Sequence, residues 1–175
     1  MSFRRLARLC FLVAFAQPAM AEDAAQTGAR QVVGLFLKSC INFTGDRLAL
    51  REWAARTGLP QLADPAREAF LYGLPGMVFD ATAQGSKLVL VSQDSGSCSV
   101  VAAAADGAMV IEELERALKA SQISLQVTRD ATDAKEAALR HREYSAAGGN
   151  RQWQMLVSTV QAPGGGSAML TANPG

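Results

Sequence analysis

The sequence predicts a single α+β domain, in which N-terminal helices and one later helix pack on a mainly antiparallel sheet of about six or seven strands. Three observations support this fold class. Between residues 29 and 73, apolar side chains recur at helical spacing. From residue 77 they form short runs separated by turn-forming residues, as in antiparallel strands. One amphipathic stretch, residues 109–120, then interrupts the strands. This order is typical of an α+β domain, and it leaves open whether the strands form one sheet or two.

Residues 1–21 have the layout of a secretory signal peptide. Three arginines without an acidic residue precede an apolar run from Leu9 to Ala16, and an A-x-A sequence ends at Ala21. The run of eight apolar residues is too short to cross a bilayer, and no later stretch approaches the length of a membrane span. We therefore expect a soluble periplasmic protein that is cleaved after Ala21 and has no membrane span after processing.

Processing would leave fourteen basic residues against sixteen acidic ones, a net charge of −2. This charge gives no broad basic field, so we do not expect nucleic acid as a partner. Residues 22–28 are small and polar and predict a flexible lead-in. The single domain then covers residues 29–172, and residues 173–175 form a short tail.

Three helices are predicted in the first half of the chain. Apolar side chains at positions 32, 33, 36, 37 and 40 share one helix face, which places Cys40 on the buried side near the C-terminal end. A second helix runs from about Asp46 to Thr57 and stops at Gly58. The pair Asp64-Pro65 predicts an N-cap followed by a first-turn proline, and thus a short helix that ends at Gly73.

The remaining elements follow from changes in period. Short strands are predicted over residues 77–81, 87–93 and 97–103, followed by the helix over 109–120. Apolar residues alternate with polar ones at positions 123, 125 and 127, which predicts a half-buried strand, and residues 130–136 predict a charged loop. Two longer strands, 138–146 and 151–161, should pair across a glycine turn, and the run Gly164-Gly165-Gly166 should turn the chain into a last strand over 168–172.

Two cysteines, Cys40 and Cys98, remain after processing. An even number of cysteines in an exported chain indicates a disulfide, and closing a loop of 58 residues would contribute roughly 4 kcal/mol. The alternative is a cysteine nucleophile paired with His141. Cys40, however, lies near a helix C-terminus, where the dipole does not lower the thiol pKa, and Cys98 lies in a predicted strand. We therefore expect a bridge that holds the first helix on the strand of Cys98.

Three short segments resemble an uncharacterised family of proteobacterial envelope proteins and lipoproteins. They are the helix end Phe36–Cys40, the step Leu74-Pro75-Gly76 before a strand, and the run from Asp94 to Val100. The resemblance would extend over most of the processed chain. It implies export and a disulfide between helix and strand, and it implies no activity. The chain differs from lipoproteins at its N-terminus, where Cys10 does not follow the usual small residue.

No metal site, cofactor or catalytic residue is predicted. His141 is the one histidine of the chain, and the sequence has no H-x-x-x-H or C-x-x-C spacing for a metal. It also has no G-x-S-x-G elbow, although a Ser/His/Asp triad built from distant residues stays possible. The glycines at 164–166 are not followed by the lysine and helix of a phosphate loop.

A candidate binding patch lies on the predicted hairpin of residues 138–161. Arg140, Arg142 and Tyr144 share one strand face, His141 lies between the arginines, and Trp153 is on the partner strand. Such a group can hold an anionic ligand or the edge of a partner protein. The alternative is an ordinary solvated sheet face with Trp153 in the core.

Two functional hypotheses follow. The first is a non-enzymatic periplasmic protein that binds an unidentified protein or small molecule of the cell envelope, for example as an immunity or inhibitor protein. The second is a small cell-envelope hydrolase with His141 as its base. An open cleft with an acid or a nucleophile within hydrogen-bond reach of His141 would favour the hydrolase. A His141 packed on a sheet face would favour the binding protein.

Overall fold

The computed structural model describes residues 18–162 and 165–175. The predicted signal peptide lies outside the described residues as far as position 17, and so does Gly164 of the predicted glycine turn. The described elements follow the predicted order: N-terminal helices, three strands, one helix and four strands. The fold is α+β, as predicted.

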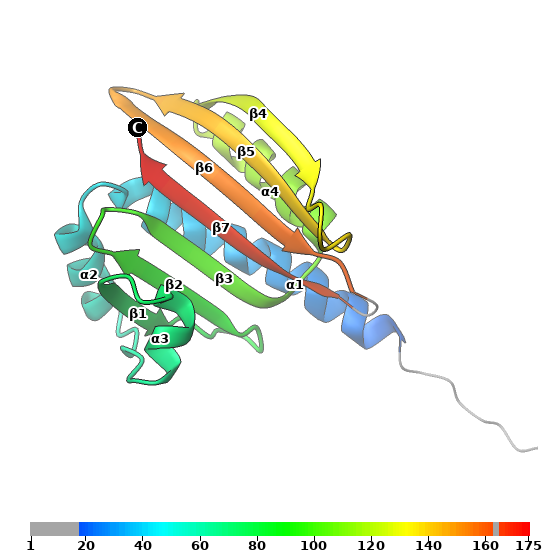
Figure 1. Cartoon of the computed structure of the whole chain (residues 1–175), viewed down its shortest axis with the longest axis horizontal. Coiled ribbons are helices and arrows are strands. Elements are labelled where there is room, and N and C mark those ends of the chain that lie inside the picture. Colours follow the sequence, from blue (N-terminus) through cyan, green and yellow to red (C-terminus); the bar gives the residue numbers. More distant parts are fainter. Residues whose placement is uncertain (1–17, 163–164) are drawn as a thin grey trace, which may run out of the picture.

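The seven described strands form one antiparallel sheet, which decides between one sheet and two (Figure 1). Its order is β1-β2-β3-β7-β6-β5-β4, so the C-terminal strand β7 lies in the middle and joins two groups of consecutive strands. The strands are β1 (Gly76–Asp80), β2 (Leu88–Gln93), β3 (Cys98–Ala105), β4 (Ser124–Thr132), β5 (Leu139–Gly148), β6 (Arg151–Val160) and β7 (Gly166–Pro174).

The helices lie mainly on one side of this sheet, which we call the helix face. They are α1 (Pro18–Phe36), which continues into the π-helical turn η1 (Leu37–Ile41), then α2 (Arg47–Arg56), α3 (Ala66–Leu71) and α4 (Gly107–Ala120). Figure 1 shows α1 and α4 behind the sheet and α3 in front of β1 and β2. We call the side of α3 the outer face. Beyond β1 and β2, no described helix covers the outer face.

The main core lies between the helix face and α1, η1, α2 and α4. Apolar side chains at every second position of the strands meet the buried stripes of the helices, as the two periodicities require. A second, smaller cluster holds α3 on the outer face through Leu71, Val78 and Val91. Helix α1 crosses β3 very closely at Gly28, where an added Cβ would lie 1.9 Å from the carbonyl oxygen of Ala104.

The two ends of the predicted domain differ from expectation. We expected a flexible lead-in over residues 22–28, but the structure has them within α1. The reason is close packing: Ala25 is buried, and its carbonyl oxygen accepts a hydrogen bond from Asp106 N–H at 3.0 Å. At the other end, residues 173 and 174 are not a tail but the end of β7, where Asn173 pairs with Gln154 of β6.

Two local expectations were also wrong. Asp64 does not cap α3; its carboxylate pairs with Arg67 at 2.9 Å, and the chain leaves the helix one residue before Gly73, at Tyr72 in the left-handed region with φ of 51°. Residues 130–132 belong to β4 rather than to a loop. A β-bulge at Thr128 lets this strand continue along β5, with Arg129 opposite Glu143 and Asp130 opposite Arg142.

Candidate functional site

The five residues of the predicted patch lie in three separate places. Arg140, Arg142 and Tyr144 share the helix face of β5, as predicted. His141 points to the outer face, because neighbouring strand residues alternate. Trp153 is on the helix face at the far end of the hairpin, opposite Ala146, and is only 3% exposed. The structure therefore brings together three of the five residues.

The first group is an arginine cluster in which both guanidinium groups are already paired with carboxylates. Asp130 accepts from Arg140 Nε at 2.7 Å and Nη2 at 2.6 Å, and from Arg142 Nη1 at 2.9 Å. Arg142 Nη2 also pairs with Glu115 of α4 at 2.9 Å, and the Tyr144 hydroxyl donates to the same carboxylate at 2.8 Å. The hydrogen bonds from Arg140 hold the pKa of Asp130 below its usual value, while burial raises the pKa of Tyr144.

This arrangement argues against an anion site at Arg140 and Arg142. Two carboxylates face the two arginines, so the cluster has no surplus positive charge for a ligand. It ties β4, β5 and α4 together instead. The sequence showed the arginines and the tyrosine, but not Asp130 and Glu115, because a bulge and a helix from another part of the chain bring those acids into place.

His141 lies beside a hydroxyl and a carboxylate on the outer face. Ser158 is its directly opposite residue on β6, and His141 Nδ1 is 2.9 Å from Ser158 Oγ. On the other side of the ring, Nε2 is 3.9 Å from Asp133 Oδ2. Backbone N–H groups of Lys135 and Glu136 bond to Asp133 and lower the pKa of its carboxyl. Neither Ser158 nor Asp133 was among the predicted site residues, because the predicted strand ends at 146 and 151 would have paired residue 141 with 156, whereas in the structure Gly148 pairs with Arg151.

These three side chains have the composition of a catalytic triad but not its surroundings. Ser158 lies in the middle of β6, between β5 and β7, so neighbouring backbone N–H groups are used in the sheet ladders. Backbone donors for an oxyanion are therefore lacking around Ser158. None of the three described pockets includes His141. The geometry is that of a polar pair across two strands.

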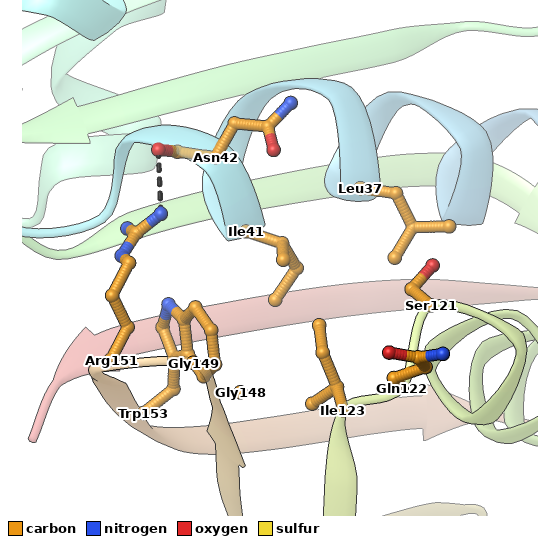
Figure 2. A pocket seen from close by; sticks show the side chains of 10 residues that line it. All are labelled: Leu37, Ile41, Asn42, Ser121, Gln122, Ile123, Gly148, Gly149, Arg151 and Trp153. Carbon is orange, nitrogen blue, oxygen red and sulfur yellow. Dashed lines mark hydrogen bonds between the residues drawn. The ribbon is translucent and has the colours of Figure 1, made fainter.

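A pocket of about 380 Å³ lies at the other end of the hairpin, beside Trp153 (Figure 2). We call it the Trp153 pocket. Its lining comes from η1, the α4–β4 connection and the β5–β6 turn, and consists of Leu37, Ile41, Asn42, Ser121, Gln122, Ile123, Gly148, Gly149, Arg151 and Trp153. The guanidinium of Arg151 lies 5.0 Å above the centre of the Trp153 ring. Arg151 was not among the predicted site residues.

A third feature is an apolar groove of about 430 Å³ beside the free edge of β4, which we call the edge groove. It is lined by Glu115, Lys119, Ile123, Ser124, Leu125, Val127 and Tyr144. Val127, on the strand itself, is 44% exposed. The edge groove lies on the helix face, between β4 and the neighbouring turns of α4.

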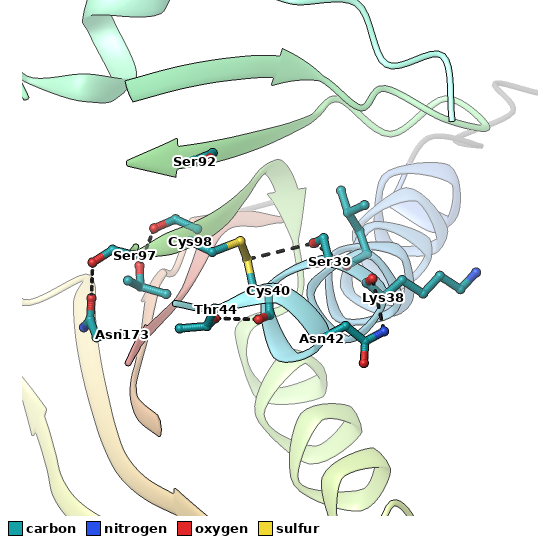
Figure 3. The surroundings of a disulfide bond; sticks show 12 residues. Lys38, Ser39, Cys40, Asn42, Thr44, Ser92, Ser97, Cys98 and Asn173 are labelled. Atoms are coloured by element: carbon teal, nitrogen blue, oxygen red, sulfur yellow. Dashed lines mark hydrogen bonds between the residues drawn. A yellow bond between two sulfur atoms is a disulfide. The ribbon is translucent and has the colours of Figure 1, made fainter. Parts of the chain in front are cut away.

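The predicted disulfide between Cys40 and Cys98 is confirmed. The bridge joins η1 to the start of β3, with the two Cα atoms 5.2 Å apart (Figure 3). Both cysteines are buried in the main core. Nearby, Thr44 Oγ1 donates to the Cys40 carbonyl oxygen and Ser97 Oγ donates to Asn173 at 2.6 Å, so the end of β7 is held beside the bridge. No cysteine of the described chain is therefore available as a nucleophile.

Within residues 18–162 and 165–175, no group of three or more metal-binding side chains is placed to hold an ion. None of the helices described there is both long and apolar enough to span a membrane. Comparison of the chain with family models, curated proteins and solved structures gave no match.

Proposed function

We propose that the protein is an exported, non-enzymatic binding protein of the cell envelope that pairs an extended segment of a partner protein with the edge of β4. The observation that carries this proposal is a contrast between the two edges of the sheet. One edge is covered by the protein's own chain, and the other is not covered by any described segment. The immunity or inhibitor role suggested by the sequence would be one form of this function.

The covered edge is β1. Leu62 N–H donates to Val78 O, and Asp80 N–H donates to Pro60 O, both at 2.8 Å, with Gln61 opposite Phe79. The segment before α3 thus acts as a short eighth strand. At the opposite end of the sheet, β4 leaves a row of backbone donors and acceptors without a partner strand among the described residues. Such a row is a template for pairing with another extended chain.

The edge groove favours a short, alternating partner segment. The bulge at Thr128 ends the first regular stretch of the edge, Ser124–Val127, before the strand continues at Arg129. A strand laid along these residues would direct every second side chain towards Leu125, Val127 and the side of α4. Glu115 is already paired with Arg142, so Lys119 is the one further charge of the lining and the other lining residues are uncharged. A second copy fits less well, because the bulge prevents two β4 strands from pairing along their full length.

The cysteines and the N-terminal sequence support the proposed compartment. A disulfide persists in an oxidising compartment such as the periplasm, and the signal layout places cleavage after Ala21. Cleavage there would leave residues 22–36 of α1 in the processed protein. N-terminal sequencing of the exported protein should begin with Glu22-Asp23-Ala24. A cytoplasmic protein that retains Met1 would refute the export proposal.

The partner surface can be located by site-specific photocrosslinking in cells. A photoreactive residue replaces the exposed Gln126 of β4 in one variant and the exposed Gln154 of the outer face in another. We expect crosslinks from position 126 and none from position 154. Val127→Lys should abolish the crosslink, because it places a charge beside the edge groove. Leu48→Lys is the matched control, since Leu48 is exposed at 69% but lies on α2.

Crosslinks from position 154 alone, or crosslinks from 126 that survive Val127→Lys, would overturn the proposed edge. Identification of the crosslinked residue on the partner supplies the positive evidence: it should lie in an extended segment with apolar residues at alternate positions. Leu48→Lys should change neither the crosslink nor the stability of the protein.

A second candidate function, a hydrolase, is favoured by one observation, the alignment of Ser158, His141 and Asp133. In that reaction Ser158 Oγ would attack an acyl carbon while its proton passes to His141. A fluorophosphonate probe tests this directly, because an activated serine displaces the fluoride and forms an Oγ–P bond. We expect no labelling of Ser158, and we expect His141→Ala to retain partner binding. Labelling of the native protein that is lost in both Ser158→Ala and His141→Ala would establish the hydrolase instead.

A further inference from the structure

We propose that the Trp153 pocket is a separate binding site for a small carboxylate with an apolar body. The inference does not depend on the proposed edge function: the two linings share Ile123, but Arg151 and Trp153, which carry the inference, are not part of the edge groove. Its volume of about 380 Å³ lies within the usual range of small-molecule sites. Three features of its lining define the ligand: one uncompensated cation, one orphan donor and an apolar wall.

The cation is Arg151, the single charged residue of the lining. Its Nη1 donates to Asn42 O at 2.8 Å (Figure 2), and its Nη2 donates to Thr44 O at 3.0 Å. These neutral carbonyl groups fix the guanidinium but do not neutralise it. None of the ion pairs in the described part of the chain includes Arg151. A guanidinium has five N–H donors, so this one keeps donors for an anionic oxygen, and carboxylates are among its best partners.

The orphan donor is the indole Nε1 of Trp153. This nitrogen is buried and has no hydrogen-bond partner among the described residues. Buried polar groups without partners are rare in folded proteins, and each costs about 1–3 kcal/mol. In Figure 2 the nitrogen lies at the end of the ring that is turned towards η1, on the side of Arg151. The guanidinium and the indole N–H are therefore in the same corner of the pocket, where one carboxylate would serve both.

The apolar wall is opposite this corner. Leu37 and Ile41 of η1 face Ile123 across the pocket, and the Trp153 ring lies beside them, below Arg151 (Figure 2). This wall suits a short aliphatic or aromatic group. A single cation is too little for a nucleotide or a polyphosphate, and the absence of acids in the lining excludes a cationic ligand or a metal. The carboxylate could belong to a free organic acid or to the C-terminus of a peptide, and the experiment separates these sources.

Trp153 itself supplies the readout. In a Trp53→Phe background, Trp153 is the single tryptophan, so its fluorescence reports the pocket. The probes are hexanoate, its neutral counterpart hexanamide, the peptide Gly-Ala-Leu with a free C-terminus, and the same peptide as an amide. We expect saturable binding of an acid that is about tenfold or more tighter than that of its amide. The acid that binds identifies the source of the carboxylate.

Two variants assign the effect to the pocket. Arg151→Gln should weaken binding of the acid about tenfold or more and leave the weak binding of the amide unchanged. Because Arg151 also holds two backbone carbonyls, Ser121→Phe at the exposed rim is the second variant, expected to block all probes without altering unfolding. Arg129→Gln, an exposed arginine of β4, is the matched control and should bind normally. Equal affinity for acid and amide, or no saturable change with any of the four probes, would overturn the proposal.

Discussion

Asp130 shows how a single residue, turned to the other face of the sheet, changes the net charge beside Arg140 and Arg142. The alternation of β5 correctly predicted that Arg140 and Arg142 share a face. Without a bulge, Asp130 would have faced the outer side of β4, and the two arginines would have been free to bind an anion. The extra residue at Thr128 turns Asp130 to the helix face. Residue types do not reveal a bulge of this kind, so this part of the site could not be predicted.

The Asp130 carboxylate should stabilise the protein only where it is ionised. Arg140 and then Arg142 hold its folded-state pKa below the usual value. Its contribution is therefore fully present above the unfolded pKa of about 4 and is lost as the pH falls through the lower folded pKa. At pH 7, we expect Asp130→Asn to reduce the free energy of unfolding by about 1 kcal/mol. Urea unfolding should show this difference shrinking towards pH 3.

The matched control for this prediction is Glu112→Gln, because Glu112 is an exposed residue of α4 that takes part in none of the described ion pairs. Its unfolding midpoint should follow the wild type at both pH values. A constant difference between Asp130→Asn and wild type across the pH range would contradict the electrostatic explanation.

The remaining site residues differ in whether the sequence alone could have revealed them. Ser158 could have been found only from the exact turn register: Gly148 opposite Arg151 places it opposite His141, whereas the predicted strand ends at 146 and 151 would place residue 156 there. Arg151 could not, because its role depends on the carbonyls of Asn42 and Thr44, which lie more than a hundred residues away in the chain. Trp153 was predicted as a site or core residue, and it is in fact both buried and part of a pocket lining.

At the level of elements, hydrophobic periodicity was a good guide where an element buries one face. Helix α4 and strands β1 to β3 agree with prediction within a few residues. Hydrophobic periodicity did not predict the helix over residues 22–28, because these residues have no apolar stripe. Their helix forms because small residues let α1 lie directly on β3. Close packing of this kind has no hydrophobic signature in the sequence.

The contact between α1 and β3 predicts opposite effects for two glycines of the same helix. A Cβ at Gly28 would lie 1.9 Å from the carbonyl oxygen of Ala104, whereas one at Gly34 would have no atom within 4 Å. Gly28→Ala should therefore destabilise the protein by about 1–3 kcal/mol. Gly34→Ala should stabilise it by about 0.5–1 kcal/mol, because alanine favours the helix. Thermal unfolding of both variants checks the pair; a neutral Gly28→Ala would argue against the close crossing.

On the scale of the whole molecule, the fold class and the disulfide were predictable, and the order of the strands was not. Hairpin turns predict which consecutive strands pair. They do not predict that β7, besides pairing with the preceding strand β6, also pairs with β3, since that second pairing joins segments far apart in the sequence. The Cys40–Cys98 bridge was predicted from the number of cysteines in a chain expected to be exported. It joins the helical part to the sheet and makes one cooperative unit of the two.

Loss of this bridge should weaken the whole domain. Cys98→Ser should lower the free energy of unfolding by roughly 4 kcal/mol, the value for a closed loop of 58 residues. A reductant should destabilise the wild type to the same extent and have no further effect on the variant. Thiol titration of the denatured, unreduced processed protein should find no free thiol. Two reactive thiols would refute the bridge in the exported protein.

The central position of β7 also determines when the sheet can be completed during synthesis of the chain. Ser99 and Thr171, hydrogen-bonded neighbours on β3 and β7, are 72 residues apart. Until the last strand has been synthesised, β3 and β6 each have an open edge, and the two halves of the sheet have no strand between them. A partly emerged chain therefore cannot close its sheet. If the chain crosses a membrane unfolded, as the proposed export requires, this topology delays completion of the sheet until β7 has arrived.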